Sequence, residues 1–255
     1  MNLLCDIINP AQRSKFTDDP PKRRKGINMR YKNIKTGIFK ERPNRFIAMV
    51  EIDGVVEVCH VKNTGRCKEL LMPDVTVYVE ESDNPNRKTK YSLIGVQKGE
   101  RLINMDSQAP NQVVYEWLKG GGLFSDIVIL KKEKTYGSSR FDLYVERSNS
   151  KAFIEVKGVT LEDNGVVRFP DAPTVRGVKH IHELIECKED GYEAYIIFVI
   201  QMKGVAYFEP NDTTHREFGI ALQEAKRQGV SILAYDCEIT PDEITLQEEV
   251  EIRIE

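Results

Sequence analysis

The sequence lacks the features of a membrane-spanning, disulfide-bonded or zinc-ribbon protein. No apolar run approaches the roughly 20 residues of a membrane-spanning helix, and the apolar residues 1–8 have neither a basic leader nor a cleavage site. The five cysteines are odd in number and scattered, without a C-x-x-C pair, which argues against a disulfide framework and a zinc ribbon. We therefore expect a cytoplasmic protein that does not enter the membrane.

The sequence also lacks an overall excess of positive charge. Its formal net charge of −3 argues against indiscriminate coating of nucleic acid. The charge is unevenly distributed, because residues 1–45 carry twelve Lys and Arg against four Asp and Glu, while residues 236–255 carry eight acids and one Arg. Any contact with DNA must therefore use a local patch.

Residues 1–28 have no sustained hydrophobic period and end near the basic string P-P-K-R-R-K. Their composition predicts a disordered basic extension. Two interpretations stay open. The extension is either an arm that contacts phosphate groups, or a mis-called start that precedes the true first residue, Met29.

Residues 29–105 have the pattern of a small barrel. The strands expected at residues 46–52 and 55–61 flank Asp53-Gly54, a strong hairpin signal. Further strands are expected at residues 75–80, 91–97 and 101–104, with a short helix at residues 66–72 that Pro73 closes. Short strands at this spacing fit a closed barrel such as an OB-fold.

Residues 106–237 change to an α/β pattern. A helix is expected from Ala109 to Gly120, and a second over residues 174–190 with the apolar stripe Val175, Val178, Ile181, Leu184 and Ile185. The nearly continuous apolar run 194–201 predicts a buried central strand. The remaining elements are expected at residues 126–134, 205–208, 214–228 and 232–235. Residues 238–255 form an acidic tail to which no structure is assigned.

A hairpin within this α/β segment carries the most informative pattern. Residues 140–146 and 152–157 alternate between apolar and polar side chains around the turn 147–150. If the turn is centred between Ser148 and Asn149, the residue numbers of each cross-strand pair sum to 297. In that register Asp142 lies opposite Glu155. The alternation places Phe141 on the face of Leu143, away from Asp142.

Two facing carboxylates repel each other unless one is protonated or a cation lies between them. Mg²⁺ binds one or two carboxylates together with water and phosphate oxygens, and Lys157 would stabilise charge on a phosphoryl group. The hairpin therefore favours a phosphodiesterase site at Asp142, Glu155 and Lys157. The alternative is that these are ordinary charged residues on the solvent face of a hairpin.

Neighbouring residues extend this hypothesis. Arg176, Lys179 and His180 recur at helical spacing and form a phosphate cradle or, alternatively, the solvated face of an amphipathic helix. Glu116, on the preceding helix, is an ordinary exposed acid or a third carboxylate of the site.

Four strings of the sequence are similar to the sugar fermentation stimulation protein A (SfsA) family: H-V-K-N-T-G-R (residues 60–66), R-F-D (140–142), F-I-E-V-K-G-V-T-L (153–161) and F-P-D-A-P-T-V-R-G-V-K-H (169–180). The resemblance spans about residues 31–236. It implies an N-terminal OB-like barrel joined to a C-terminal PD-(D/E)xK restriction-endonuclease-like α/β domain. It also implies non-specific DNA binding and a regulatory role in sugar (maltose) metabolism.

The resemblance implies roles for individual residues. Asp142 and Glu155 would bind Mg²⁺ or Mn²⁺, Lys157 would be the catalytic lysine, and Glu116 an accessory acid. Nucleic acid would contact the basic residues Arg140, Arg176, Lys179 and His180. Asn63, Thr64 and Gly65 match the N-T-G string, whose role is turn formation or contact with nucleic acid or with the catalytic domain.

Three functions compete. The first is a metal-dependent nuclease acting on DNA, because all three catalytic positions carry the required chemistry. The second is a non-catalytic DNA-binding regulator whose barrel binds a strand through Phe46, Tyr78 or Tyr91. RNA is a third possibility, since nothing in the sequence reads a 2′-hydroxyl group.

Overall fold

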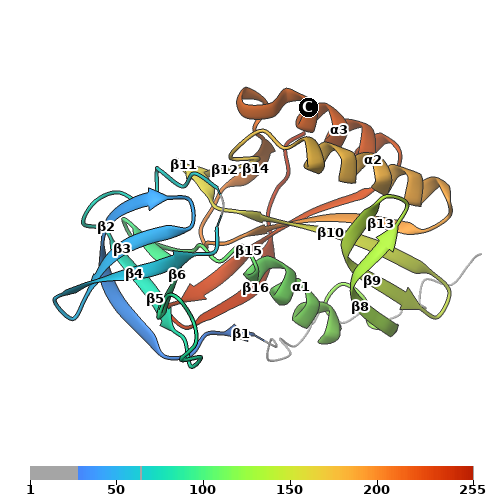
Figure 1. Ribbon diagram of the computed structural model, residues 1–255. Helices are drawn as coiled ribbons and strands as arrows, with labels where there is room; N and C mark the ends of the chain where they lie inside the picture. The colour runs from blue at the N-terminus through green and yellow to red at the C-terminus, as the bar shows by residue number, and fades with distance from the viewer. Residues whose placement is uncertain (1–27, 64, 255) are drawn as a thin grey trace, which may run out of the picture.

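The computed structural model describes residues 28–63 and 65–254. The prediction for residues 1–27 and the role of Thr64 therefore lie outside the described residues. Figure 1 shows a barrel on one side and a larger α/β domain on the other. Within the described residues, no helix is both long and apolar enough to cross a membrane.

The N-terminal half forms a closed five-stranded barrel. Its strands are β2 (Ile34–Asn44), β3 (Ile47–Ile52), β4 (Val55–Val61), β5 (Thr76–Glu81) and β6 (Tyr91–Lys98). Parallel pairing of β4 with β6 closes the barrel, and β7 (Arg101–Asn104) extends it beyond β6. The predicted OB-like barrel is confirmed, although the strand β2 was not identified from the sequence.

The prediction of a short helix at residues 66–72 is wrong. The segment is a turn in which the N–H groups of Leu70 and Leu71 donate to the carbonyl of Cys67. Cys67 has a φ of 45°, which a helix does not accommodate. In addition, the guanidinium of Arg42 binds the carbonyls of Gly65 and Arg66, which a helix would need for its own hydrogen bonds.

The C-terminal half is built on a seven-stranded sheet of order β1-β16-β15-β13-β10-β9-β8. Its strands are β1 (Met29–Arg30), β8 (Ile127–Tyr136), β9 (Ser139–Arg147), β10 (Lys151–Val159), β13 (Glu193–Ile200), β15 (Ser231–Thr240) and β16 (Glu243–Glu249). The central strands β10, β13 and β15 are parallel. A small second sheet contains β11 (Leu161–Asp163), β12 (Val166–Phe169) and β14 (Tyr207–Pro210).

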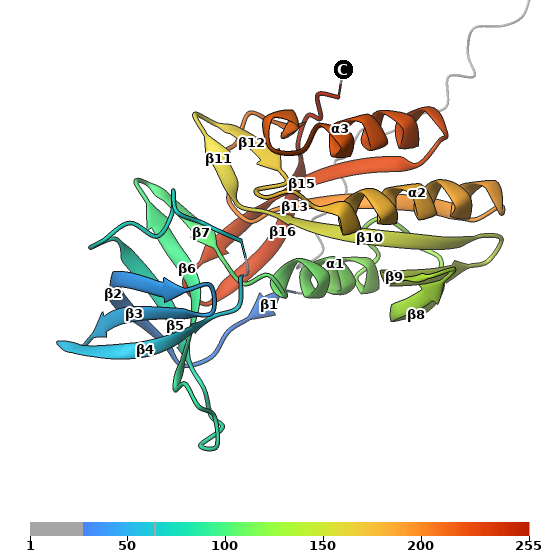
Figure 2. The ribbon, with the colours of Figure 1, turned by 45° about the horizontal axis from the view of Figure 1, so that its top comes forward.

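Helices cover both faces of the large sheet. Helix α1 (Ala109–Lys119) lies on one face, and α2 (Val175–Glu189) and α3 (Asp212–Arg227) lie on the other, as Figure 2 shows. The expected helix at residues 174–190 is confirmed, with Thr174 as its N-cap. Val175 is an exception to its predicted apolar stripe, because this side chain is 80% exposed at the first turn while Ile181 and Leu184 are fully buried.

The acidic tail expected at residues 238–255, to which the sequence assigned no structure, contains strand residues within its described part. Residues 238–240 complete β15, and Glu243–Glu249 forms β16, which pairs with β15 and with β1. Ile244 and Leu246 on β16 are buried against the face covered by α1. The alternation of apolar and acidic residues thus provides one buried face and one exposed face.

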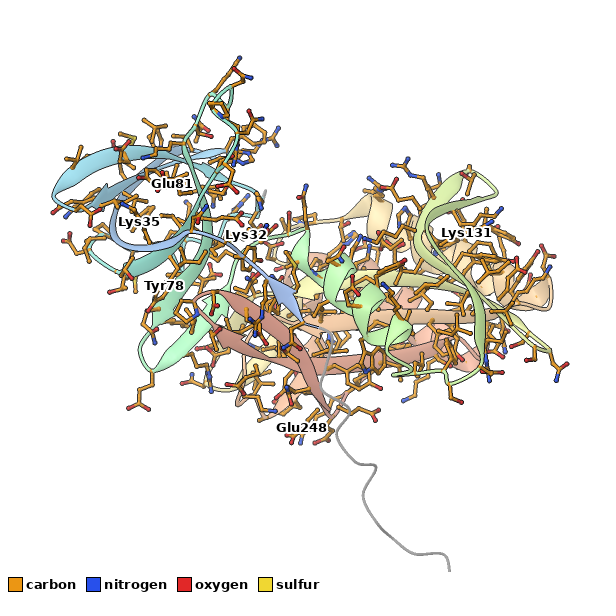
Figure 3. The ribbon with its side chains drawn as sticks, turned by 90° about the horizontal axis from the view of Figure 1, so that it is seen from below. Lys32, Lys35, Tyr78, Glu81, Lys131 and Glu248 are labelled. Carbon is orange, nitrogen blue, oxygen red and sulfur yellow. The ribbon has the colours of Figure 1, made fainter. Side chains whose placement is uncertain are left out.

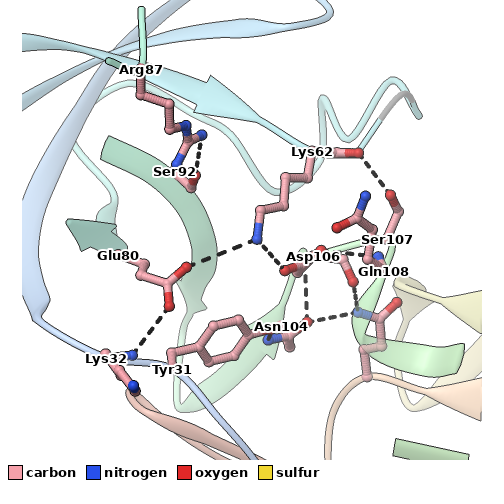
Figure 4. Close-up of polar contacts among 11 residues, drawn as sticks. Tyr31, Lys32, Lys62, Glu80, Arg87, Ser92, Asn104, Asp106, Ser107 and Gln108 are labelled. Atoms are coloured by element: carbon pink, nitrogen blue, oxygen red, sulfur yellow. Dashed lines mark hydrogen bonds and ion pairs between the residues drawn. The ribbon is translucent and has the colours of Figure 1, made fainter. Parts of the chain in front are cut away.

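A buried polar network joins the barrel to the larger domain (Figure 4). The fully buried carboxylate of Asp106 accepts hydrogen bonds from Lys62 Nζ (2.8 Å) and from the N–H of Gln108 (2.9 Å). The side-chain amide of Gln201 donates to Asn104, which in turn donates to the hydroxyl of Tyr31. Burial raises the pKa of Tyr31, so the hydroxyl stays protonated.

A second junction consists of an ion pair between the domains. Glu162 on β11 is almost fully buried and accepts hydrogen bonds from Lys98 (2.8 Å) and Arg101 (2.5 Å) of the barrel strands β6 and β7. Burial alone would raise the pKa of Glu162, but the contacts with Lys98, the N–H of Gly165 and Arg101 lower it to about 2. The charged carboxylate therefore stabilises the folded protein.

We expect Glu162→Gln to lower the free energy of unfolding at pH 7 by about 2 kcal/mol, because a lowered pKa is a stability contribution. This contribution is complete above the ordinary pKa of 4.5 and is lost as the pH falls towards 2. Urea unfolding at pH 7 and pH 4 should show a smaller difference between the two proteins at pH 4. Asp163→Asn, an exposed change on the same strand, is the control; an equal difference at both pH values would contradict the prediction.

Candidate active site on the β9–β10 hairpin

The hairpin has the predicted register. Lys151 pairs with Glu146, and the pairing continues as far as Ile154 and Leu143, each pair summing to 297. Beyond this point the backbone pairing ends, and the carboxylate of Asp142 accepts the N–H of Val156 at 2.8 Å. The strands separate at the position where the sequence placed two facing carboxylates.

One detail of the predicted alternation is wrong. Phe141 packs with Phe153 on β10 and lies edge-on to His180 of α2, so it belongs to the face covered by α2. Leu143 instead packs in the cluster on the α1 face. The strict two-residue period is interrupted at Asp142, whose side chain contacts α1.

Asp142 is held from two sides. Asn111, in the first turn of α1, donates to Oδ1 at 2.6 Å, while Val156 donates to Oδ2. Burial and the nearby charge of Glu155 raise the pKa of Asp142 to about 6, despite these hydrogen bonds. A nearby cation would stabilise the ionised form of this carboxylate.

Glu155 is 3% exposed and all of its contacts are on one oxygen. Oε1 lies 2.5 Å from Lys157 Nζ and 2.5 Å from His180 Nδ1. The other oxygen, Oε2, is buried and has no hydrogen-bond partner among the residues that the structure describes. Burial would raise the pKa of Glu155, but His180 and Lys157 lower it overall, so the carboxylate is ionised.

The hydrogen-bond partners of its two ring nitrogens indicate the tautomer of His180. Arg176 Nε donates to His180 Nε2 at 3.3 Å, so Nδ1 carries the proton and donates to Glu155. His180 is 4% exposed and therefore lies inside the protein, not on an open phosphate-binding surface. Its contacts are those of a residue that orients Glu155.

The other predicted basic residues are not gathered around the carboxylates. Arg140 is exposed and lies 3.4 Å from Glu133 on β8, and Lys179 is exposed near Glu183. Glu116 accepts a hydrogen bond from Gln112 and has no contact with Asp142. The α1 side chain that reaches Asp142 is Asn111.

Two residues of the N-T-G string, Asn63 and Gly65, lie in a cleft between the two domains. Asn63 Oδ1 accepts the N–H of Gly65, which forms a turn. A Cβ atom at Gly65 would collide with the carboxylate of Asp171, from the F-P-D-A string. Both Asn63 and Gly65 line the cleft with residues 158–161, which directly follow Lys157. Gly65 therefore contacts the larger domain.

Asn111 and Arg42 were not identified from the sequence. The string A-P-N marked the start of α1, and a polar residue in the first turn of a helix that precedes the β9–β10 hairpin was the available signal for Asn111. Arg42 binds the carbonyls of Asn63 and Gly65 and so holds the turn in place. Nothing in the spacing of the sequence linked Arg42 to that turn.

The geometry fits a hard cation held by few protein ligands. No cluster of three or more His, Cys, Asp or Glu side chains suited to a metal occurs in the part of the chain that the structure describes. Asp142 and Glu155 offer two carboxylates, one with a buried oxygen that lacks a partner. Mg²⁺ is commonly bound by one or two carboxylates, with water and phosphate oxygens completing its shell.

An OB barrel followed by an α/β domain with carboxylates on a central hairpin defines a two-domain protein with a restriction-endonuclease-like (RE) domain. The family model "SfsA N-terminal OB domain" matches residues 41–105, and the model "Sugar fermentation stimulation protein RE domain" matches residues 108–243. The chain belongs to the SfsA family. The predicted family and fold class are therefore confirmed.

Individual relatives agree with this assignment. A sugar fermentation stimulation protein homolog of Ruminiclostridium cellulolyticum is 63% identical over 226 residues, which cover 89% of this chain and 100% of that protein. A homolog of Clostridium beijerinckii is 61% identical over 224 residues, or 88% and 99% of the two chains. A solved structure of Pyrococcus furiosus SfsA in complex with Ca²⁺ matches with a TM-score of 0.82 at 29% identity, covering 89% of this chain and 98% of that one.

We expect Asp142→Asn to stabilise the metal-free protein at neutral pH. Because its pKa is raised to about 6, Asp142 lowers the stability progressively as the pH rises from 3.8 to 6, and this cost persists at higher pH. Asparagine removes the charge, and Asn111 can turn its amide to accept the new N–H group. The free energy of unfolding should rise by roughly 1–3 kcal/mol at pH 7.5.

Urea unfolding in EDTA at pH 7.5 and at pH 4 measures this effect. The gain should nearly vanish at pH 4, where Asp142 is mostly protonated in the folded protein. Asp163→Asn, which changes an exposed carboxylate, should leave the stability unchanged at both pH values. A variant less stable than the parent at pH 7.5 would refute the account of Asp142.

Proposed function

We propose that this protein is a metal-dependent nuclease that binds DNA and hydrolyses its phosphodiester bonds. The observation that carries the proposal is the buried, unpartnered Oε2 of Glu155 beside the carboxylate of Asp142. A buried ionised oxygen without a donor is costly. A divalent cation held by this oxygen and by Asp142 would satisfy it and would supply positive charge to a phosphate group.

Each residue then has a chemical role. Asp142 and Glu155 would hold Mg²⁺ or Mn²⁺, which supplies charge neutralisation at the phosphoryl group and a more acidic water. His180 orients Glu155 through Nδ1, and Asn111 orients Asp142. Lys157, whose ammonium lies 2.5 Å from Glu155, is placed to stabilise negative charge as the phosphate is attacked.

The structure of the Pyrococcus furiosus relative is a complex with Ca²⁺, which supports the proposal that this protein binds a divalent cation. Ca²⁺ and Mg²⁺ both prefer oxygen ligands, but Ca²⁺ accepts longer and less regular coordination. We therefore expect Ca²⁺ to occupy the site of this protein and Mg²⁺ or Mn²⁺ to support cleavage.

Basic residues outside the site offer a surface for the phosphate backbone. Lys131, Lys132 and Lys134 are exposed on the edge strand β8, and Lys132 lies 4.4 Å from the ring of Tyr115 on α1. Figure 3 shows α1 between this strand, where Lys131 is labelled, and the barrel, where Lys35 is labelled. Such a patch supports DNA binding despite the negative net charge. RNA is an alternative substrate with the same backbone charge.

The second candidate is a non-catalytic DNA-binding regulator linked to sugar metabolism. The names of the relatives favour the sugar connection. On the barrel, Phe46 is 44% exposed with Arg45 stacked 4.7 Å from its ring centre, which suits the binding of a base. Of the other predicted stacking residues, Tyr91 is only 3% exposed, because its ring packs in the core, and it therefore has no free face for a base.

A cleavage assay separates the two candidates. End-labelled single-stranded and duplex DNA, and RNA, are incubated with the protein in Mg²⁺, Mn²⁺, Ca²⁺ or EDTA. We expect cleavage in Mg²⁺ or Mn²⁺ only, reduced at least about 100-fold in Asp142→Asn and Lys157→Met because transition-state stabilisation is lost. Lys151→Gln, on the same hairpin but at its turn, should cleave normally. If the protein binds DNA but cleaves it in none of the metals, the non-catalytic regulator is the remaining candidate.

The role of His180 has its own prediction. We expect His180→Ala to weaken both Mn²⁺ binding and cleavage about 10–100-fold, as is typical when the partner of a metal ligand is removed. His180→Asn, whose amide nitrogen occupies the place of Nδ1, should recover a large part of both. Electron paramagnetic resonance of free Mn²⁺ gives the affinity without turnover. Equal losses in both variants would show that His180 acts through packing instead.

A further inference from the structure

The cleft between the barrel and the larger domain is not explained by the carboxylate site alone. It has a volume of roughly 170 Å³ and is lined by Asn63, Gly65, Ser107, residues 158–161, Arg168, Phe169, Asp171 and Gln201. Its walls thus come from both domains. Pockets for drug-sized ligands are larger, about 300–1,000 Å³, so this cleft fits one ring-sized group.

Several polar groups in the cleft are available to a ligand. Within the described residues, hydrogen-bond partners are lacking for Asn63 Nδ2, the Thr160 hydroxyl, both oxygens of Asp171 and Gln201 Oε1. They comprise one donor, one hydroxyl and three acceptor oxygens. Thr160 and Gln201 are also largely buried, 9% and 1% exposed, and directly follow the last residues of β10 and β13.

The charges in the cleft disfavour a phosphate group. Arg168 is neutralised by Glu209 at 2.7 Å, and Asp171 forms no ion pair within the part of the chain that the structure describes. A neutral ring that carries N–H or O–H donors is the complementary ligand. Phe169, whose ring packs on Phe198 and Phe218, adds an aromatic wall.

Two segments link the cleft to the carboxylate site. The first is the end of β10 and the residue after it: Gly158 and Thr160 follow Lys157 by one and three residues. The second is the string F-P-D-A-P-T-V-R-G-V-K-H, whose first residues line the cleft and whose last, His180, binds Glu155. A ligand in the cleft therefore contacts the same segments that position the reacting groups.

We propose that this cleft binds one unpaired nucleoside, base or pentose, of the strand whose phosphate lies at Asp142 and Glu155. The inference rests on the proposed action on nucleic acid and deepens it, because a base held in the cleft is not paired. The protein then prefers single-stranded DNA or frayed ends to an intact duplex. The contact between Gly65 and Asp171 keeps the barrel close enough to form the cleft wall.

Fluorescence anisotropy of labelled 12-mers in Ca²⁺ tests the proposal. The single strand should bind at least about 5-fold more tightly than a blunt duplex of the same sequence. Asp171→Ala and Thr160→Val should each weaken binding of the single strand about 5-fold and leave the duplex affinity unchanged. Asp163→Ala, exposed on the neighbouring β11 and outside the cleft, is the matched control. Circular dichroism melting confirms that each variant is folded.

A second measurement locates the base directly. A single 4-thiothymine is moved along the strand, and cross-linked peptides are identified by mass spectrometry after irradiation. One position should cross-link to residues 158–171. Cross-links confined to β8 or to Phe46, or cleft variants that bind single strands like the parent protein, would overturn the proposal. So would calorimetric binding of maltose or glucose that Asp171→Ala abolishes while nucleosides do not bind.

The outcome for the cleft is independent of the outcome for cleavage. If Mg²⁺-dependent cleavage occurs but the cleft variants bind and cleave like the parent, the cleft proposal alone fails. If no metal supports cleavage but the cleft variants lose single-strand binding selectively, the nuclease proposal fails and the cleft proposal is supported.

Discussion

The ionised carboxylate of Glu155, buried in the centre of the large sheet, is the constraint around which the surrounding structure is arranged. A charge in this position is unfavourable unless it is paired and hydrogen-bonded. The lysine two residues along the same strand and a histidine from α2 both contact its Oε1. Helix α2 must therefore lie over β10 at this level, with His180 facing the sheet. The F-P-D-A string that leads into α2 is consequently held beside the end of β10.

The same principle operates at the domain junctions. Asp106 and Glu162 are buried acids, and each is matched by cations of the barrel, Lys62 for the first and Lys98 and Arg101 for the second. Such pairs contribute specificity of orientation, because displacement of the barrel would leave a buried charge without its partner. The cleft beside Lys157 depends on this orientation, since one wall belongs to the barrel.

The sequence was most informative where a pattern is local. Alternation and turn residues predicted the β9–β10 register, and the helical period predicted α2 with its N-cap. Prediction failed where a distant partner decides the structure. The helix at residues 66–72 is displaced by Arg42, 23 and 24 residues before the carbonyls that it binds. The segment expected to be an acidic tail becomes a strand because β15 and β1 offer it partners on both sides.

For the candidate site, the proximity of Asp142, Glu155 and Lys157 was predicted from the sequence, because their spacing on two strands fixes which residues lie near one another. His180 was also identified, but with a different role, since a helical face shows which residues are neighbours and not which are buried. Asn111 and the cleft escaped prediction because they depend on how α1 and the barrel pack against the hairpin. Residue spacing carries little information on packing between elements.

The position of β1 has a consequence for how the protein folds. Met29 and Arg30 form the edge of the large sheet by pairing with Ile244 and Glu243, more than 200 residues later. The chain thus leaves the large sheet, builds the entire barrel, and returns to the same sheet through α1. In topological terms the barrel is an insertion between two parts of one domain, and no single cut releases the domains from each other. The pairing of β1 with β16 joins residues that are far apart in the sequence. Formation of that edge of the sheet therefore requires a non-local contact, which slows folding.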